Sequence, residues 1–161
     1  MTCDKKTWLL ILVLIIGIVV GIGVYAVLSS GVHDQIRYCV VTEKAPLPIG
    51  PYSQAVRIDD LVFLSGQIGL DPQTGNLTDT AGRQTTQAME NLGAVLQQEG
   101  LGFSDVVQTK IYLTDMADWD TINDIYGSYF EGKYPARATV QVTGLPKGAK
   151  VEIEMVAKKS Q

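Results

Sequence analysis

The chain has 161 residues, enough for one domain of ordinary size and one additional segment. It is 46% hydrophobic with a formal net charge of −4, and from Val41 onward fifteen acidic residues outnumber ten basic ones. No basic stripe with interleaved aromatic residues occurs, which argues against a nucleic-acid partner. Cys3 and Cys39 are too few for a disulfide framework, and no metal-ligand spacing is present. The only histidine, His33, precedes the domain, so a His-based metal site or catalytic triad is excluded.

The N-terminal region is dominated by an uncharged run of 21 residues, Trp8 to Leu28, made almost wholly of Leu, Ile, Val and Gly. A helix of this length spans about 31 Å, which matches the hydrocarbon core of a bilayer. A cleaved signal peptide is the alternative, although its apolar region is usually only about 7–15 residues long. The predicted parts of the chain are a tail (1–7), a transmembrane helix (8–28), a connector (29–37) and a domain (38–161).

The charges that flank this run predict its orientation. Lys5 and Lys6 precede it, whereas the residues from Ser29 to His33 carry no lysine or arginine. The positive-inside bias keeps the lysine-bearing end in the cytosol. The sequence therefore predicts a single-pass membrane protein whose domain lies on the non-cytosolic side.

The domain mixes strand and helix patterns. Two strands flank the turn residues Asp59 and Asp60, which is a hairpin signal. Apolar residues then recur every three or four positions from Asp79 until Gly100, which predicts a helix that ends at a glycine. The predicted elements, in chain order, are strands 36–42, 53–58 and 61–68, a helix from 79, strand 106–113, a helix at 118–130 and a closing hairpin at 134–157.

This order predicts an α+β fold in which a single sheet packs with two helices. Two helices cover only part of a sheet, and the closing segment supplies many apolar strand positions. Oligomerisation is therefore expected, because the remaining apolar surface needs cover. The apolar positions in question are Val140, Val142, Val151, Ile153 and Met155.

The closing segment also holds the residues best suited to chemistry. Arg137 lies where a loop enters a strand, and the planar fork of an arginine binds a carboxylate through two parallel hydrogen bonds. Glu152 lies on the next strand, on the face opposite Val151 and Ile153. A glutamate there can orient a water for attack on the same small molecule. An ordinary surface hairpin with solvated charges is the alternative.

Three separated segments carry a resemblance to a known family. They are Ala45-Pro46-Leu47-Pro48-Ile49-Gly50-Pro51-Tyr52-Ser53-Gln54-Ala55, Leu61-Val62-Phe63-Leu64-Ser65-Gly66-Gln67-Ile68-Gly69, and the segment from Tyr134 to Ala157. In this order they resemble the signature segments of the RidA/YjgF family, the small trimeric enamine/imine deaminases. The resemblance implies a chorismate-mutase-like single sheet with two helices, a barrel-like homotrimer and sites between subunits.

The resemblance also implies roles for individual residues. Arg137 corresponds to the arginine that clamps the substrate carboxylate, and Glu152 to the group that positions the attacking water, with Glu154 as its structural neighbour. The family often has cysteine two positions after the arginine; this chain has Thr139, which can still donate a hydrogen bond. The implied substrate-binding residues are Tyr52, Ser65, Gly66, Asn123, Arg137 and Thr139.

The predicted function is hydrolytic deamination of reactive enamines and imines. Substrates such as 2-aminoacrylate, 2-iminopropanoate and 2-iminobutanoate would give 2-oxo acids and ammonia. No cofactor or metal is expected, because the imine carbon is already electrophilic and positioning with proton transfer suffices. The alternative is a non-catalytic module that binds small carboxylates, or a regulatory one, on a membrane anchor, since a fold does not dictate its function.

Overall fold

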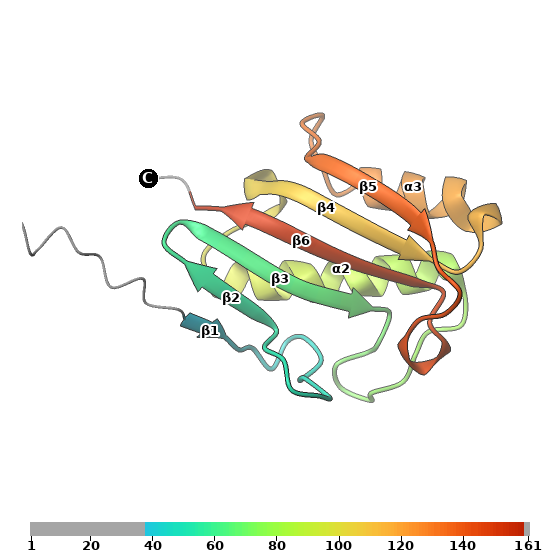
Figure 1. Cartoon of the computed structure of the whole chain (residues 1–161), viewed down its shortest axis with the longest axis horizontal. Coiled ribbons are helices and arrows are strands. Elements are labelled where there is room, and N and C mark those ends of the chain that lie inside the picture. Colours follow the sequence, from blue (N-terminus) through green and yellow to red (C-terminus); the bar gives the residue numbers. More distant parts are fainter. Residues whose placement is uncertain (1–37, 160–161) are drawn as a thin grey trace, which may run out of the picture. The chain divides into compact units, whose positions relative to one another are not determined.

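A computed structural model describes residues 38–159. In that range the chain forms one six-stranded mixed sheet with two α-helices packed on one face (Figure 1). This confirms the predicted α+β fold with a single sheet and two helices. The elements are β1 (Tyr38–Val40), β2 (Ala55–Ile58), β3 (Leu61–Ile68), α2 (Ala81–Gln98), η1 (Phe103–Asp105), β4 (Val106–Leu113), η2 (Met116–Asp118), α3 (Trp119–Gly127), β5 (Ala136–Gln141), η3 (Pro146–Gly148) and β6 (Val151–Lys158).

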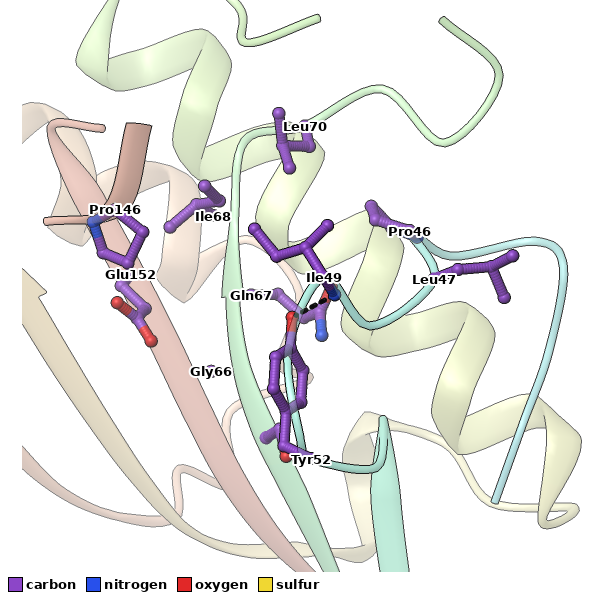
Figure 2. A pocket seen from close by; sticks show the side chains of 11 residues that line it. Pro46, Leu47, Ile49, Tyr52, Gly66, Gln67, Ile68, Leu70, Pro146 and Glu152 are labelled. Carbon is purple, nitrogen blue, oxygen red and sulfur yellow. Dashed lines mark hydrogen bonds between the residues drawn. The ribbon is translucent and has the colours of Figure 1, made fainter. Parts of the chain in front are cut away.

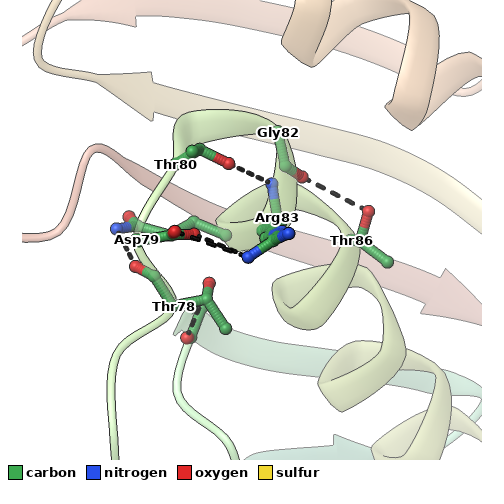
Figure 3. Close-up of polar contacts among 8 residues, drawn as sticks. Thr78, Asp79, Thr80, Gly82, Arg83 and Thr86 are labelled. Atoms are coloured by element: carbon green, nitrogen blue, oxygen red, sulfur yellow. Dashed lines mark hydrogen bonds and ion pairs between the residues drawn. The ribbon is translucent and has the colours of Figure 1, made fainter.

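The first hairpin and the long helix follow their local sequence signals. Asp59 adopts a φ of 54° in the predicted turn between β2 and β3. At the start of α2 the side chain of Thr80 accepts a hydrogen bond from the Arg83 backbone amide at 3.2 Å, which makes Thr80 the N-cap (Figure 3). The helix therefore begins two residues after the predicted Asp79. Gly100, with a φ of +70°, lies just past its end, as predicted.

The predicted closing hairpin does not form. The strand order is β1-β2-β3-β6-β4-β5, so β4 lies between β5 and β6 (Figure 1). β5 runs parallel to β4, and α3 supplies the crossover that a parallel pair requires. The chain then passes back over the end of β4, and β6 enters the sheet between β3 and β4, antiparallel to both. A central position suits β6 because its alternate residues are fully buried.

The hydrophobic core lies between the sheet and the helices. Leu92 and Leu96 of α2 are completely buried in one cluster with Val151 and Ile153 of β6. The apolar residues of β6, which were expected to need cover from another subunit, are thus covered by the chain's own helices. The face of the sheet opposite the helices is uncovered within residues 38–159, and there Val140 of β5 is 46% exposed.

The membrane localisation predicted from the N-terminal run is corrected here. The predicted transmembrane helix at 8–28 lies outside the described residues. Within residues 38–159 no helix is long and apolar enough to cross a bilayer. The longer α-helix, α2, has 18 residues of mixed polarity, whereas a span needs about 20 consecutive apolar residues. The membrane anchor and the non-cytosolic placement of the domain are accordingly withdrawn.

Candidate functional site

A pocket of about 240 Å³ opens where β3 and β6 meet the segment before β2 (Figure 2). Its walls are mostly apolar, and its polar groups are concentrated on the two strands. Four residues of the pre-β2 segment line one side of it. The lining residues are Pro46, Leu47, Ile49, Tyr52, Ser65, Gly66, Gln67, Ile68, Leu70, Pro146 and Glu152.

The carboxylate of Glu152 is the charged group of this pocket. Its neighbours on β6, Val151 and Ile153, are fully buried beneath α2, so Glu152 lies on the uncovered face of the sheet, as the alternation predicted. Its side chain is half-buried and makes no hydrogen bond within residues 38–159. Partial burial raises the pKa of Glu152 above its ordinary value, and the nearby Glu154 raises it further.

Gly66 permits the close approach of this carboxylate to β3. A Cβ atom at position 66 would lie 2.8 Å from Cδ of Glu152, closer than real Cβ contacts allow. Any larger residue there would displace the carboxylate. Gly66 lies within the register shift between Leu64 and Gln67, where β3 bulges away from β6. The glycine therefore sets the space in which Glu152 faces the pocket.

Glu154 has a different environment on the same face of β6. Its Oε1 accepts a hydrogen bond from Nζ of Lys110 at 2.7 Å in an ion pair across β4 and β6. That pairing raises the pKa of Lys110. Of the two carboxylates, Glu154 thus has a structural partner, whereas Glu152 has none among the residues that the structure describes.

Tyr52 and Ser65 complete the polar side of the pocket. Tyr52 is 48% exposed, and its hydroxyl accepts a hydrogen bond from the Ile49 backbone amide at 3.3 Å, which closes the Gly-Pro-Tyr turn on itself (Figure 2). Ser65 donates its hydroxyl proton to the backbone carbonyl of Ser53 at 2.7 Å. Its hydroxyl oxygen therefore presents only lone pairs to an incoming group.

Arg137 lies in a second pocket, of about 440 Å³, beside α3. Its Nη2 donates a hydrogen bond to Oδ1 of Asn123 at 2.8 Å, so the structure brings these two predicted site residues together. The guanidinium carbon stands 4.9 Å from the centre of the Tyr126 ring. Thr139, two residues further along β5, is half-buried and lines neither pocket.

Arg137 and Glu152 lie on opposite faces of the sheet within one chain. Arg137 pairs in register with Thr109, whose hydroxyl accepts a hydrogen bond from Tyr126 of α3, so Arg137 is on the helix-covered face. Glu152 is on the uncovered face. The simple hairpin expected from sequence would have set both residues on adjacent strands, but the intervening β4 and the opposite facing keep them apart.

Three buried amide side chains that the sequence reading did not single out organise the loops around the first pocket. Gln54 bonds the backbone of Thr42, Ala45 and Pro46 through four hydrogen bonds of 2.7–3.2 Å. Asn91 of α2 donates to the carbonyls of Ile68 and Leu70. Gln84, also of α2, links Thr78 to Lys150. For Gln84 and Asn91 the sequence does offer a signal, because each is a polar residue on the otherwise apolar face of the helix.

Together these features define the class of protein: a small α+β domain with a half-buried, unpaired carboxylate in one pocket and an oriented arginine in another. The chain belongs to the family described as Endoribonuclease L-PSP, which it matches over residues 42–159. Similarity to a solved structure named RidA from Psychrobacter, at 40% identity, and to one named as the YjgF gene product of E. coli, at 36%, confirms the resemblance to the RidA/YjgF family.

Several of the similar proteins are named as deaminases. The chain is 49% identical over 123 residues to a mouse protein named 2-iminobutanoate/2-iminopropanoate deaminase, covering 76% of this chain and 91% of that one. It is 46% identical to the chloroplastic Reactive Intermediate Deaminase A of Arabidopsis thaliana, covering 83% of this chain and 72% of that one. Among solved structures, E. coli TdcF with bound serine matches with a TM-score of 0.74 and 39% identity, covering 76% of this chain and 99% of that one.

Proposed function

We propose that this chain is a cofactor-independent hydrolytic deaminase that converts reactive enamines and imines to 2-oxo acids and ammonia. Its substrates are 2-aminoacrylate with its tautomer 2-iminopropanoate, and 2-iminobutanoate, as the names of its relatives indicate. The observation that carries the proposal is the half-buried carboxylate of Glu152, which has no hydrogen-bond partner within residues 38–159 and lies against Gly66 in a mostly apolar pocket. A carboxylate in that setting is a suitable acceptor for a proton of water.

The proposed reaction needs only positioning and proton transfer. Glu152 accepts a proton of water as the water oxygen bonds to the C2 carbon of the protonated imine, which gives a neutral tetrahedral carbinolamine. Glu152 returns that proton to the nitrogen and then accepts the hydroxyl proton, so that the C–N bond breaks and ammonia leaves as the C2–O bond becomes a carbonyl. The departing ammonia takes the last proton from Glu152, which restores the carboxylate. Arg137 holds the carboxylate of the substrate through its planar fork throughout these steps.

The site is proposed to form between subunits of a homotrimer. Within one chain Arg137 and Glu152 lie on opposite faces of the sheet, so one chain alone does not assemble both around a small substrate. The uncovered face carries exposed apolar residues such as Phe63 and Val140, which supports its burial against other copies. In this arrangement Arg137 of one subunit reaches the Glu152 pocket of the next.

The remaining site residues take supporting roles in the proposal. Ser65 offers lone pairs to an N–H group of the substrate, because its own proton is bound to Ser53. Tyr52 and Ile49 form a wall beside the bound molecule. Asn123 orients Arg137 through its 2.8 Å hydrogen bond. Thr139, on the same face of β5 as Arg137, offers a hydroxyl where many family members have a thiol.

The proposal is tested by generating 2-aminoacrylate in situ with a dehydratase and trapping the remaining imine with semicarbazide. The full chain is compared with Arg137→Ala. Faster loss of imine with the wild type, and its disappearance with the variant, is the expected result. Absence of any acceleration by an intact oligomer would instead favour the non-catalytic carboxylate-binding module.

A further inference from the structure

Tyr126 of α3 lies directly against the guanidinium of Arg137. The guanidinium carbon is 4.9 Å from the centre of the Tyr126 ring, within the range of a cation–π contact. Tyr126 is only 2% exposed, so the ring is fixed in the core and not free to rotate away. Its hydroxyl donates to Oγ1 of Thr109 at 3.2 Å, and Thr109 is the register partner of Arg137 on β4. The strand pair and the helix therefore fix the ring together.

A second group from the same helix holds the guanidinium from another side. Asn123 precedes Tyr126 by three residues, which places both side chains on one face of α3. Oδ1 of Asn123 accepts a hydrogen bond from Nη2 of Arg137 at 2.8 Å. With its carbon over the ring and Nη2 bonded to the amide, the guanidinium keeps further N–H groups for a ligand.

We propose that Tyr126 is a positioning residue for carboxylate capture, and that its aromatic face holds Arg137 in the plane in which its free N–H edge meets the carboxylate of the substrate. The proposal rests on the proposed function, in which Arg137 binds that carboxylate. An arginine side chain has many rotamers. If it is ordered before the substrate binds, the conformational entropy lost on binding is smaller.

The Tyr126 phenol is neutral, so Arg137 contacts an aromatic ring and does not form an ion pair with a tyrosinate. Burial raises the pKa of Tyr126, which keeps the hydroxyl protonated at neutral pH and available to Thr109. The ring of Phe130 packs against that of Tyr126 with centroids 4.8 Å apart, and supports it from the core side. The face of the Tyr126 ring thus attracts the guanidinium of Arg137, whereas the hydroxyl fixes the ring in place through its hydrogen bond to Thr109.

The test compares Tyr126→Phe, which keeps the ring, with Tyr126→Leu, which removes it, in the full chain. We expect KM for 2-iminopropanoate to change less than about threefold in Tyr126→Phe and to rise about tenfold in Tyr126→Leu, with kcat nearly unchanged. Binding of 2-oxobutanoate, measured by calorimetry, should weaken in parallel. Tyr129→Leu is the matched control, because the Tyr129 ring packs on Phe103 and not on Arg137.

If Tyr126→Leu does not fold, the role of the ring can still be tested with substitutions that preserve its packing. Phenylalanine with increasing numbers of fluorine atoms, incorporated at position 126, keeps the ring but removes the negative potential of its face. KM should rise stepwise with fluorination. The proposal is overturned if KM does not change with the number of fluorine atoms. It is also overturned if Tyr126→Leu binds 2-oxobutanoate as tightly as the wild type does.

The outcome for Tyr126 is separable from that for the deaminase activity. If the wild type binds 2-oxobutanoate and the ring dependence is observed, but imine loss is not accelerated, the positioning role stands and the proposed function fails. If the wild type accelerates imine loss and the Tyr126 variants behave alike, the function stands and the positioning role fails. Wild-type protein that does not bind 2-oxobutanoate contradicts the positioning role.

Discussion

At the residue scale, the two glutamates of β6 show how environment assigns different chemistry to the same side chain. Both lie on the uncovered face, but Glu154 is paired with Lys110, whereas Glu152 has no ion-pair partner between residues 38 and 159. Glu152→Gln keeps the volume and removes the proton acceptor, so kcat/KM for 2-iminopropanoate should fall roughly 10²–10³-fold. Glu154→Gln, the matched control, should fall less than about tenfold. Equal losses in both variants would contradict the assignment of Glu152 as the acceptor.

The environment of Glu152 also predicts how activity depends on pH. Its pKa is raised above the ordinary 4.5, and the ionised form is the active one, so activity should fall on acidification with a midpoint above 4.5. Glu154→Gln removes a charge that raises this pKa, and should move the midpoint to lower pH. A pH–rate profile of both proteins measures this, and an acid limb unmoved by Glu154→Gln would contradict the coupling.

The same raised pKa predicts that acidification, which lowers activity, removes a source of instability in the fold. Because the folded state favours protonated Glu152, the ionised carboxylate destabilises the fold at neutral pH, and this loss disappears as the pH falls through the folded pKa. Glu152→Gln should therefore have a higher urea midpoint than the wild type at pH 7, and the difference should shrink on acidification. Urea titrations at several pH values check the sign.

At the element scale, the side chain of Gln54 holds the segment between β1 and β2 through four hydrogen bonds. Gln54→Leu would leave the backbone groups at Thr42, Ala45 and Pro46 without partners, and should cost about 2–4 kcal/mol in the free energy of unfolding. Gln98→Leu, at an exposed position, should change it by less than about 0.5 kcal/mol. Chemical denaturation of both variants measures the difference; similar values would show that the network contributes little.

Local patterns in the sequence were sufficient for the strands at 61–68 and 106–113, whose bounds are as predicted, because turn residues bound both runs. They were not sufficient for strand neighbours, since the insertion of β6 between β3 and β4 depends on long-range pairing. The motifs assigned all the site residues to one site, whereas within residues 38–159 Arg137 and Asn123 lie in one pocket and Tyr52, Ser65, Gly66 and Glu152 in another. The roles of the Gln54, Gln84 and Asn91 side chains could not be predicted, because they depend on where the loops lie in the folded structure.

At the scale of the whole molecule, the uncovered face of the sheet is proposed to be the trimer interface. Val140→Asp would bury an unpaired carboxylate there, and should dissociate the oligomer and lower kcat/KM at least tenfold. Met116→Asp is the control, because Met116 is 47% exposed, as Val140 is 46% exposed, but belongs to η2 rather than the sheet. Sedimentation velocity with both variants checks the assembly, and an oligomer that tolerates Val140→Asp would argue against this interface.

A deaminase site shared between subunits can be tested by mixing two inactive variants. Arg137→Ala and Glu152→Gln chains, carrying different tags, are co-expressed, captured through both tags in turn and assayed for imine loss. If Arg137 of one subunit serves Glu152 of the next, each captured mixed trimer contains one restored site out of three, and activity should recover to about one third of wild type. Mixed oligomers that stay inactive beside an active wild type would contradict a deaminase site shared between subunits.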